Sequence, residues 1–309
     1  MDVQWCIIMS AQSSRTDRAT VAAFAVLVIL VSANFVAIRF SNRELAPFWG
    51  AGTRFAMAAV LFMAIVAVRR IALPHGAALA GALLFGLLDI AAFFALSYWG
   101  LVRVPAGQGA VIGALFPLVT LFLAVAHGLE RLSWRALAGA VLAIVGVAVV
   151  SGEQIRGDVP LISLLAILAA VVCGAEASIV IKWFPRTDPA ATSAVAMTVG
   201  AVLLLTLSVV IGEPRALPSL GATWAAIAYL VSIGTVGVFL LFLFVLQRWQ
   251  ASAVAYVFVL APFVSVALAA GFLGEELTPL SAVGAVLVLS GVYVAALAPH
   301  IHAAPSGHR

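Results

Sequence analysis

The 309-residue sequence is poor in charge, with Asp, Glu, Lys and Arg making up only 9% of the chain, where soluble proteins carry about a quarter. A water-soluble surface cannot be built from so few charges when 65% of the residues are hydrophobic. In lipid, by contrast, a helix can be apolar on every side. We therefore expect the bilayer to be the solvent and partner of this chain.

The sequence also lacks the motifs of several protein classes. It has two cysteines, Cys6 and Cys173, so no disulfide framework is expected. It contains no GxxxxGK[ST] loop for ATP, no HExxH zinc motif and no suitable GxSxG nucleophile motif. The net charge of +4 comes from basic residues scattered singly or in pairs, which indicates membrane topology and no nucleic-acid partner. We expect no enzyme, no cofactor and no metal site.

Ten long apolar runs are separated by short segments with charge, Pro or Gly. Each run has the length, roughly 17 to 25 residues, that a helix needs to cross the hydrocarbon core. Continuous apolar runs in lipid must be helical, because the bilayer offers the backbone no hydrogen bonds. The sequence predicts an all-α integral membrane protein with ten transmembrane helices, at residues 19–38, 46–68, 77–99, 104–126, 134–151, 160–181, 190–211, 221–245, 251–272 and 278–297.

An internal repeat appears when the sequence is shifted by about 145 residues. PLVTLFLAVAHGLERLSWRALAGAVLAIVGV then aligns without a gap with PFVSVALAAGFLGEELTPLSAVGAVLVLSGV, so that Pro117 matches Pro262 and Glu130 matches Glu275. Each half has five runs, an odd number, so the second half must enter the membrane in the opposite sense. We predict two inverted five-helix repeats, 19–151 and 152–298, between cytoplasmic tails at 1–18 and 299–309.

The loop charges predict the orientation. With both termini in the cytoplasm, about ten Lys and Arg residues lie inside and about five outside, which fits the positive-inside rule. The expected location is the cell inner (plasma) membrane, with a multi-pass topology.

The doubled stretch from Pro117 and from Pro262 resembles the drug/metabolite transporter superfamily in its ten-helix EamA-type branch. A second likeness is APFWGAGTRF, in which Pro47 opens the second helix and Arg54 follows about two turns later. The resemblance covers Ala19 to about Leu297. It implies a basket of two inverted halves, a substrate cavity between them, and alternating access.

Ionisable groups at membrane depth are costly and are therefore functional candidates. Asp89 lies near the middle of the third run and Arg54 in the outer part of the second. One interpretation makes Asp89 a proton-titrating or cation-facing carboxylate. The alternative makes Asp89 and Arg54 a structural ion pair.

Glu176 lies in the sixth run, with no cation at comparable depth in its half. Its pseudo-symmetric position in the first run is near Asn34, so the two polar groups are expected to line a shared cavity from opposite sides of the midplane. The alternative is a helix-to-helix hydrogen bond from a protonated Glu176.

The remaining candidates are aromatic or shape the helices. Phe85 and Phe93 flank Asp89 at plus and minus four, an arrangement that suits an organic cation if the face is internal. The candidates for substrate binding or coupling are thus Asn34, Arg54, Asp89, Phe93, Glu176 and Tyr256. Two prolines, Pro117 and Pro262, are hinge candidates, with a static kink as the alternative.

Two further patterns concern packing. Small residues form one smooth face on the fifth and tenth helices, at Gly139, Ala143 and Gly146 and again at Gly284 and Gly291, which predicts close helix packing or a dimer contact. An aromatic belt at the helix ends is predicted from Trp49, Tyr98, Trp99, Trp134, Trp183, Trp224 and Trp249.

The function predicted from the sequence is a secondary transporter that exports small metabolites such as amino acids by alternating access, as a monomer or homodimer, with proton coupling left open. Multidrug or organic-cation efflux by the same fold is the alternative. A channel or an intramembrane enzyme is a different class that the doubled, inverted chain and the missing motifs disfavour.

Overall fold

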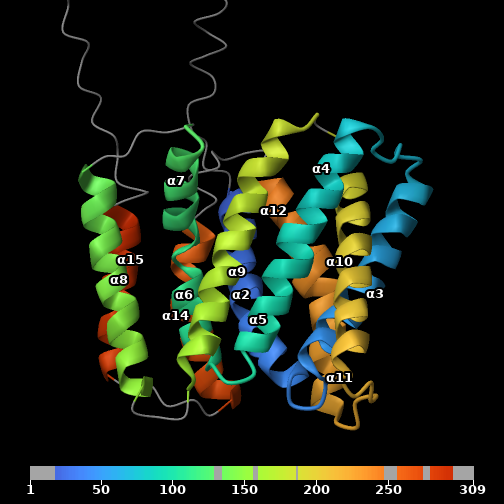
Figure 1. Ribbon diagram of the computed structural model, residues 1–309. Coiled ribbons are helices and arrows are strands. Elements are labelled where there is room, and N and C mark those ends of the chain that lie inside the picture. Colours follow the sequence, from blue (N-terminus) through green and yellow to red (C-terminus); the bar gives the residue numbers. More distant parts are fainter. Residues whose placement is uncertain are drawn as a thin grey trace, which may run out of the picture.

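A computed structural model of the chain describes residues 18–128, 134–155, 159–185, 187–246, 256–273 and 279–294, all of whose regular elements are helices. The protein is an all-α membrane protein of ten transmembrane helices arranged as two inverted five-helix repeats (Figure 1). Of the predicted tails at 1–18 and 299–309, only Arg18 belongs to the described residues, as the first residue of α2. The exact repeat boundaries stay predictions.

The first half forms five spans. Two of them, the third and the fourth, are interrupted or divided within the membrane. The spans are α2 (Arg18–Ser41), α3 (Pro47–Val68), a third built from α4 (Ala77–Phe85), η1 (Gly86–Ala92) and α5 (Phe93–Gly100), a fourth built from α6 (Ala106–Gly113) and α7 (Phe116–Ala126), and α8 (Trp134–Ile155).

The second half repeats this series. Its spans are α9 (Leu161–Val180), followed by the short η2 (Ile181–Trp183), then α10 (Pro189–Ile211), a third built from α11 (Gly221–Ala228), η3 (Tyr229–Gly237) and α12 (Val238–Leu246), then α14 (Tyr256–Leu273) and α15 (Pro279–Val292).

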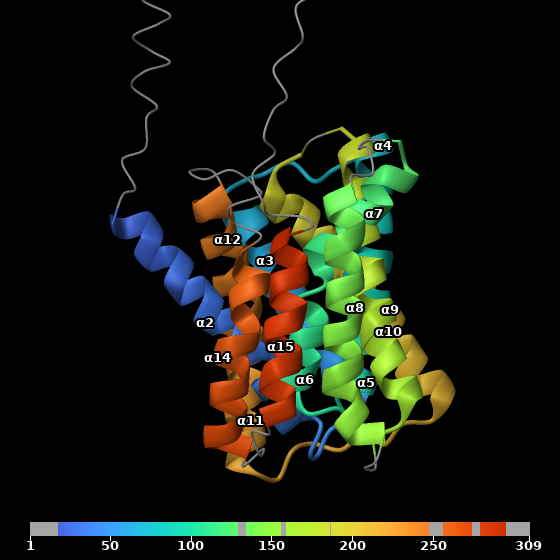
Figure 2. The ribbon, with the colours of Figure 1, turned by 90° about the vertical axis from the view of Figure 1, so that its left-hand side faces the viewer.

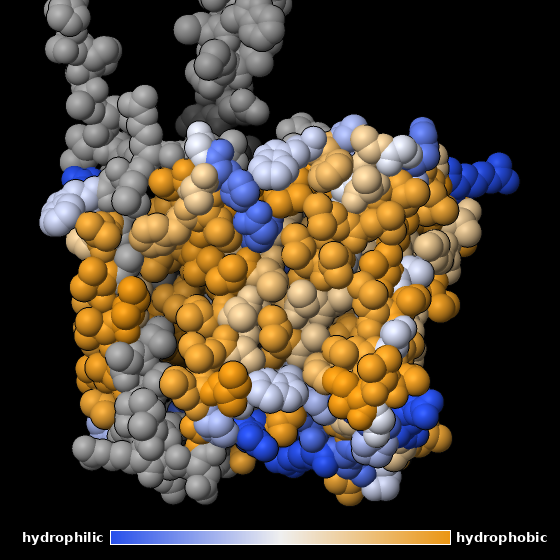
Figure 3. All heavy atoms as spheres, in the orientation of Figure 1, coloured by the Kyte–Doolittle hydropathy of each residue, from blue (hydrophilic) through white to orange (hydrophobic). Residues whose placement is uncertain are grey.

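The lengths and compositions of these helices fit a bilayer. Among the described residues, seven spans are long and apolar enough to cross one. The shorter apolar stretches Leu137–Gly146 in α8 and Ala282–Gly291 in α15, together with α14, complete the ten. Figure 3 shows the corresponding surface, a hydrophobic band with hydrophilic residues gathered toward its ends. A band of this kind can contact lipid tails without leaving charges in the hydrocarbon.

The inverted symmetry is clearest where α8 packs along α15, side by side in both ribbon views (Figures 1 and 2). A Cβ added at Gly146 would meet the Gly284 oxygen at 2.8 Å and the Val288 nitrogen at 2.5 Å. A Cβ added at Gly291 would meet the Gly139 oxygen and the Ala143 nitrogen, both at 2.5 Å. These glycines are equivalent under the 145-residue shift, so each helix presents the same face to the other in antiparallel sense. The small-residue faces predicted from the sequence pack within one chain.

The other packing pairs follow the same two-fold relation. The equivalent second helices, α3 and α10, pack against each other, and α2 on α14 is matched by α9 on the α6–α7 span. The third span of each half contacts the first and second helices of the other half. The core between the halves is built mainly of Ala, Phe, Ile and Leu.

Two runs expected to be continuous α-helices contain π-helical segments, η1 and η3, at equivalent places in the third span of each half. A π-helical turn inserts one extra residue and re-aims the following side chains, and such turns occur often at functional sites. The apolar composition of both runs gives no local sign of the change.

The two proline predictions have different outcomes. Pro117 does not bend a continuous helix, because the fourth span breaks after Gly113 and Pro117 is the second residue of α7. That position costs no helical hydrogen bond, since the first N–H groups of a helix have no intrahelical acceptor. Pro262 falls inside the continuous α14. A hinge role stays a prediction for both.

The predicted aromatic belt contains one error. Trp134, Trp183 and Trp224 are exposed, by 80%, 56% and 49%, as lipid-interface residues should be. Tyr98 is fully buried and belongs to the interior. Trp249 lies outside the described residues.

Candidate functional site

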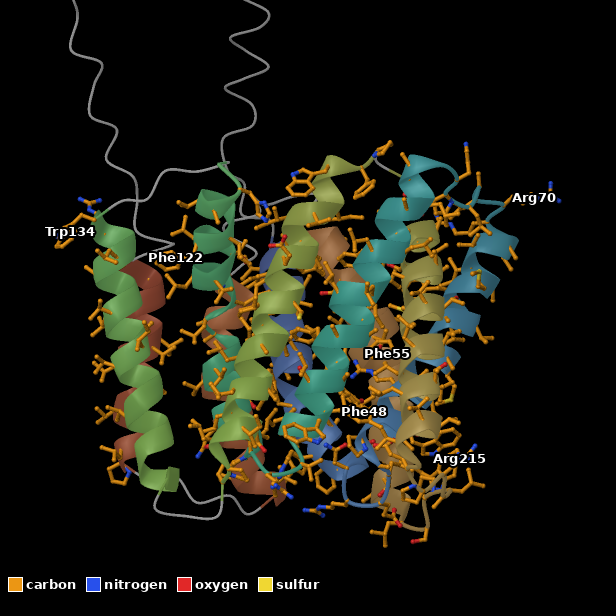
Figure 4. All side chains as sticks on the ribbon, in the orientation of Figure 1. Phe48, Phe55, Arg70, Phe122, Trp134 and Arg215 are labelled. Atoms are coloured by element: carbon orange, nitrogen blue, oxygen red, sulfur yellow. The ribbon has the colours of Figure 1, made fainter. Side chains whose placement is uncertain are left out.

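Arg54 of α3 is the centre of a buried polar cluster between the two halves. Only 3% of its surface is exposed. Its Nε donates to the Thr235 hydroxyl at 3.0 Å, and its other nitrogens donate to the Tyr98 hydroxyl at 3.3 Å and the Gly234 carbonyl at 3.2 Å. Figure 4 places the neighbouring Phe55 between Arg70 at one end of the molecule and Arg215 at the other. The cluster therefore lies at membrane depth.

Aromatic rings enclose the same guanidinium. Its carbon lies 5.0 Å from the Phe55 ring centre and 5.1 Å from that of Phe94, within the range of a cation–π contact. The two rings also pack on each other, with centroids 4.5 Å apart. The positive charge is thus held by neutral dipoles and ring faces.

Asn34 of α2 joins this cluster, as one of the predicted site residues. Its Nδ2 donates to the Gly234 carbonyl at 3.1 Å, the acceptor that Arg54 also uses. Its Oδ1 is buried and has no hydrogen-bond partner among the described residues. Buried polar atoms in folded proteins almost always have a partner, so this one requires an explanation.

Asp89 and Arg54 do not form an ion pair in the described structure, so the structural-pair interpretation of the two is wrong. Arg54 is directed to Thr235, Tyr98 and Gly234. Asp89 lies in η1 and is partly exposed. Similar depth for the two residues was predictable from their places in the apolar runs, but the direction of the Arg54 side chain was not.

Glu176 of α9 pairs with His127 at the end of α7. The His127 Nε2 lies 2.8 Å and 3.1 Å from the two carboxylate oxygens, and the two side chains are 28% and 27% exposed. The His127 ring also meets the Trp183 ring edge to face, with centroids 5.0 Å apart. The second half offered no cation for Glu176, and the partner comes from the first half.

Three other candidates are placed less completely. Phe93 packs near Gly174 of α9, where an added Cβ would lie 3.0 Å from the Phe93 ring, and its ring meets that of Phe94. Tyr256 is the first residue of α14, and the side chains of Tyr256 and Pro262 lie outside the description. Substrate contact by these residues stays a prediction.

At the end of the bundle nearest the start of α3, a loop of each half places a carboxylate at a helix start of the other half. Glu213, after α10, accepts from the N–H groups of Phe48 and Trp49 at 3.2 and 2.8 Å, at the start of α3. Glu44, between α2 and α3, accepts from the N–H groups of Ser219 and Leu220, each at 3.0 Å, at the start of α11. Each half thus caps a helix of the other, where the helix dipole favours a negative charge. We call these two contacts the carboxylate clasp.

The contacts of the clasp lower the pKa of Glu44. The Ser219 hydroxyl donates to this carboxylate, and the main-chain N–H groups of Leu220 and Ser219 add to it. These hydrogen bonds hold the pKa of Glu44 at about 2, below its ordinary 4.5. Hydrogen bonds to the ionised form are the physical cause, since they favour the carboxylate over the acid.

Sequence reasoning missed Tyr98, His127, Gly234 and Thr235. Tyr98 follows an apolar run and precedes a tryptophan, which is also the pattern of a membrane belt. His127 lies inside the stretch that carries the repeat, and only its position before Gly128 hinted at a helix end. Gly234 contributes its carbonyl, for which a side-chain pattern carries no signal.

Comparison with known proteins identifies the family. The EamA-like transporter family matches the chain twice, over residues 19–152 and 161–297. The chain belongs to the EamA-like transporter family. This EamA-like protein is a multi-pass membrane transporter, and the double match agrees with its two repeats.

Named relatives cover most of the chain. A probable amino-acid metabolite efflux pump of Escherichia coli is 30% identical over 87% of this chain and 92% of its own. An uncharacterized inner membrane transporter, YedA, of the same species is 28% identical over 91% of each chain. A probable terminal-alkyne amino-acid exporter of Streptantibioticus cattleyicolor is 29% identical over 68% of this chain and 70% of its own.

A solved crystal structure shares the fold. It matches with a TM-score of 0.64 and 20% sequence identity, over 90% of this chain and 96% of the other.

Proposed function

We propose that this EamA-like protein is a secondary exporter of amino acids or closely similar small metabolites, which works by alternating access. Two inverted halves meet along an interface that can open toward either side of the membrane. The observation that carries the proposal is the chemistry of that interface, which places one buried guanidinium and separate carboxylates at membrane depth. A guanidinium suits the carboxylate of a zwitterion, and acceptor oxygens suit its ammonium group.

The contacts at the two ends support alternating access. The carboxylate clasp joins the start of α3 to the loop after α10 and the loop before α3 to the start of α11, and the Arg54 cluster joins α3 to η3. At the opposite end, the His127–Glu176 pair joins α7 of the first half to α9 of the second. Either end opens toward solution only when the contacts between the halves at that end break. The simplest route for transport is that the contacts at one end break while those at the other end hold.

Proton coupling is part of the proposal. Asp89 and Glu176 are carboxylates within transmembrane helices, and Glu176 pairs with His127 of the other half. We expect Glu176→Gln to be produced at normal levels and to transport less, with an altered pH profile. Unchanged kinetics across pH in that variant would remove Glu176 from the coupling.

The experiment that tests the function uses purified protein in liposomes. Efflux and uptake of a panel of amino acids, organic amines and drugs are measured with and without an imposed pH difference. The proposal predicts that amino acids move and that the pH difference drives them. Transport of organic cations without amino acids would favour the alternative efflux function, for which Asp89 between aromatic residues is the supporting feature.

The proposed setting is the cell inner membrane with both termini in the cytoplasm. Cysteines introduced into the C-terminal tail should stay unlabelled by an impermeant reagent in intact cells. In this orientation the clasp faces the outside, because it lies at the far end of α2 from the cytoplasmic N-terminus. Labelling from outside would reverse both assignments.

A further inference from the structure

The Arg54 guanidinium lacks a counter-charge in the described part of the chain. Its three hydrogen bonds go to two hydroxyls and a main-chain carbonyl. A guanidinium has five N–H groups in a planar fork, so part of its donor set is unused by these bonds. A charge buried to this extent is costly unless it meets an opposite charge, and the fork matches a carboxylate held by two parallel hydrogen bonds.

Asn34 supplies the second half of the argument. Asn34 Nδ2 and an Arg54 nitrogen donate to the same Gly234 carbonyl oxygen, at 3.1 and 3.2 Å. The ends of the two side chains are therefore close together, on either side of this one oxygen. The orphaned Asn34 Oδ1 is a buried acceptor on the amide that shares the Gly234 carbonyl with Arg54. This arrangement suits a ligand that brings an N–H donor together with a negative charge.

We propose that Arg54 and Asn34 bind the head group of an α-amino acid, with the carboxylate on the guanidinium and the ammonium donating to Asn34 Oδ1. The carboxylate and the ammonium of an α-amino acid are attached to one carbon and are therefore close together. Arg54 and Asn34 are correspondingly close, because both donate to the Gly234 carbonyl. This assignment rests on the proposed function and names the group of the substrate that the site selects.

The substrate takes the place of a protein acceptor. In the structure described here, the Gly234 carbonyl occupies both donors and the cluster is closed, with Tyr98 fully buried beside it. Gly234 belongs to the π-helical η3. When η3 moves away from α3, the carbonyl withdraws and leaves two donors and one acceptor for the head group.

The test measures selectivity, because a ratio does not depend on how much active protein each sample contains. An amino acid that the wild-type protein transports in liposomes is labelled, and its efflux is inhibited by the same amino acid, by its carboxamide, and by its deaminated acid. Wild type should prefer the amino acid to the carboxamide by about tenfold or more, the effect of one charge-assisted hydrogen-bonded pair. Arg54→Gln should bring this ratio close to one.

Two further variants separate recognition from folding. Arg54→Lys keeps the charge without the fork and should give an intermediate ratio. Asn34→Ala should lower the preference for the amino acid over the deaminated acid while leaving the carboxamide ratio in place. Arg43→Gln, in the exposed loop, is the control and should match wild type. Elution as a single species from a sizing column shows that each variant folds.

The outcomes distinguish this site from the wider function. If the wild-type protein moves amino acids but Arg54→Gln keeps the full carboxamide ratio, the function stands and the site is overturned. If the wild-type protein moves only amines that lack a carboxylate, the proposed substrate class fails and this site with it.

Discussion

The second span of each half meets the third span of the other half, and the two contacts differ in chemistry. Where α3 meets η3, Arg54 and Asn34 converge on Gly234 and Thr235. Where α10 meets η1, the contact is between backbones: a Cβ added at Gly86 would lie 2.6 Å from the Ala196 oxygen. The 142-residue offset between Pro47 and Pro189, which open α3 and α10, places Ala196 at the counterpart of Arg54.

The difference shows how one duplicated framework is divided between two tasks. Both third spans keep a π-helical segment, but one presents a carbonyl to a cation and the other carries Asp89, whose counterpart under the 145-residue shift is Gly234. The tight Gly86 contact fixes one interface, while the polar interface is held by hydrogen bonds that a ligand can replace. We infer that the polar interface moves more easily.

Matched glycine substitutions test this division most strongly. Gly86→Ala should destabilise the fold by about 1–3 kcal/mol, because its Cβ meets the backbone of α10, which cannot rotate away. In Gly234→Ala, the added Cβ would lie 2.3 Å from the Asn34 Oδ1, which is the end of a side chain that can turn. It should keep most of the thermal stability and lose transport. Equal melting temperatures in detergent for both variants would contradict the comparison.

Replacing Asp89 tests the acidic side of the comparison. If one proton moves per substrate, a pH difference of one unit supplies about 1.36 kcal/mol, or about tenfold accumulation. Asp89→Asn should reduce this to no accumulation while downhill exchange continues, as measured in liposomes.

The control for Asp89 is Asp188→Asn, since Asp188 caps α10 through the Ala190 N–H and Asn caps helices equally well. Accumulation that survives Asp89→Asn would move the coupling to another group.

Replacing a carboxylate of the clasp should have a smaller effect on stability. Glu213→Gln replaces the charge at the start of α3 with a neutral amide and should lower stability by about 0.3–1 kcal/mol. We also expect it to favour opening at that end, so that an impermeant thiol reagent labels a cysteine at Gly50 faster than in the parent protein. Glu153→Gln, near the end of α8 and outside the clasp, serves as the control. Slower labelling would show that the clasp does not close this end.

The pH response of Glu44 should be the smallest effect. Its pKa is about 2 in the folded protein and about 4.5 ordinarily, so its stabilising contribution is complete above pH 4.5. The contribution falls as the pH drops from 4.5 toward 2, because the unfolded chain then binds the proton more readily. Melting curves of wild type and Glu44→Gln should differ at pH 7 and converge near pH 2. A difference that grows in acid would contradict the assignment.

The spans and the repeat were predictable because lipid imposes length and composition on every crossing helix. The same uniform composition concealed η1 and η3, since a run of apolar residues reads alike in α- and π-helices. Asn34 and Arg54 were identified by polarity at depth. Their meeting at Gly234, and that of His127 with Glu176, depends on contacts between residues far apart in the chain, which the pattern of either segment alone does not contain.

The α8–α15 contact has one more consequence. Because each of these helices offers its partner the same glycines, the surface is complementary to its own inverted copy, as in an isologous dimer interface. A single five-helix chain that inserted in both orientations would already carry both sides of this joint. The covalent link between the halves then serves to guarantee equal numbers and opposite orientations, and it leaves each copy free to diverge elsewhere.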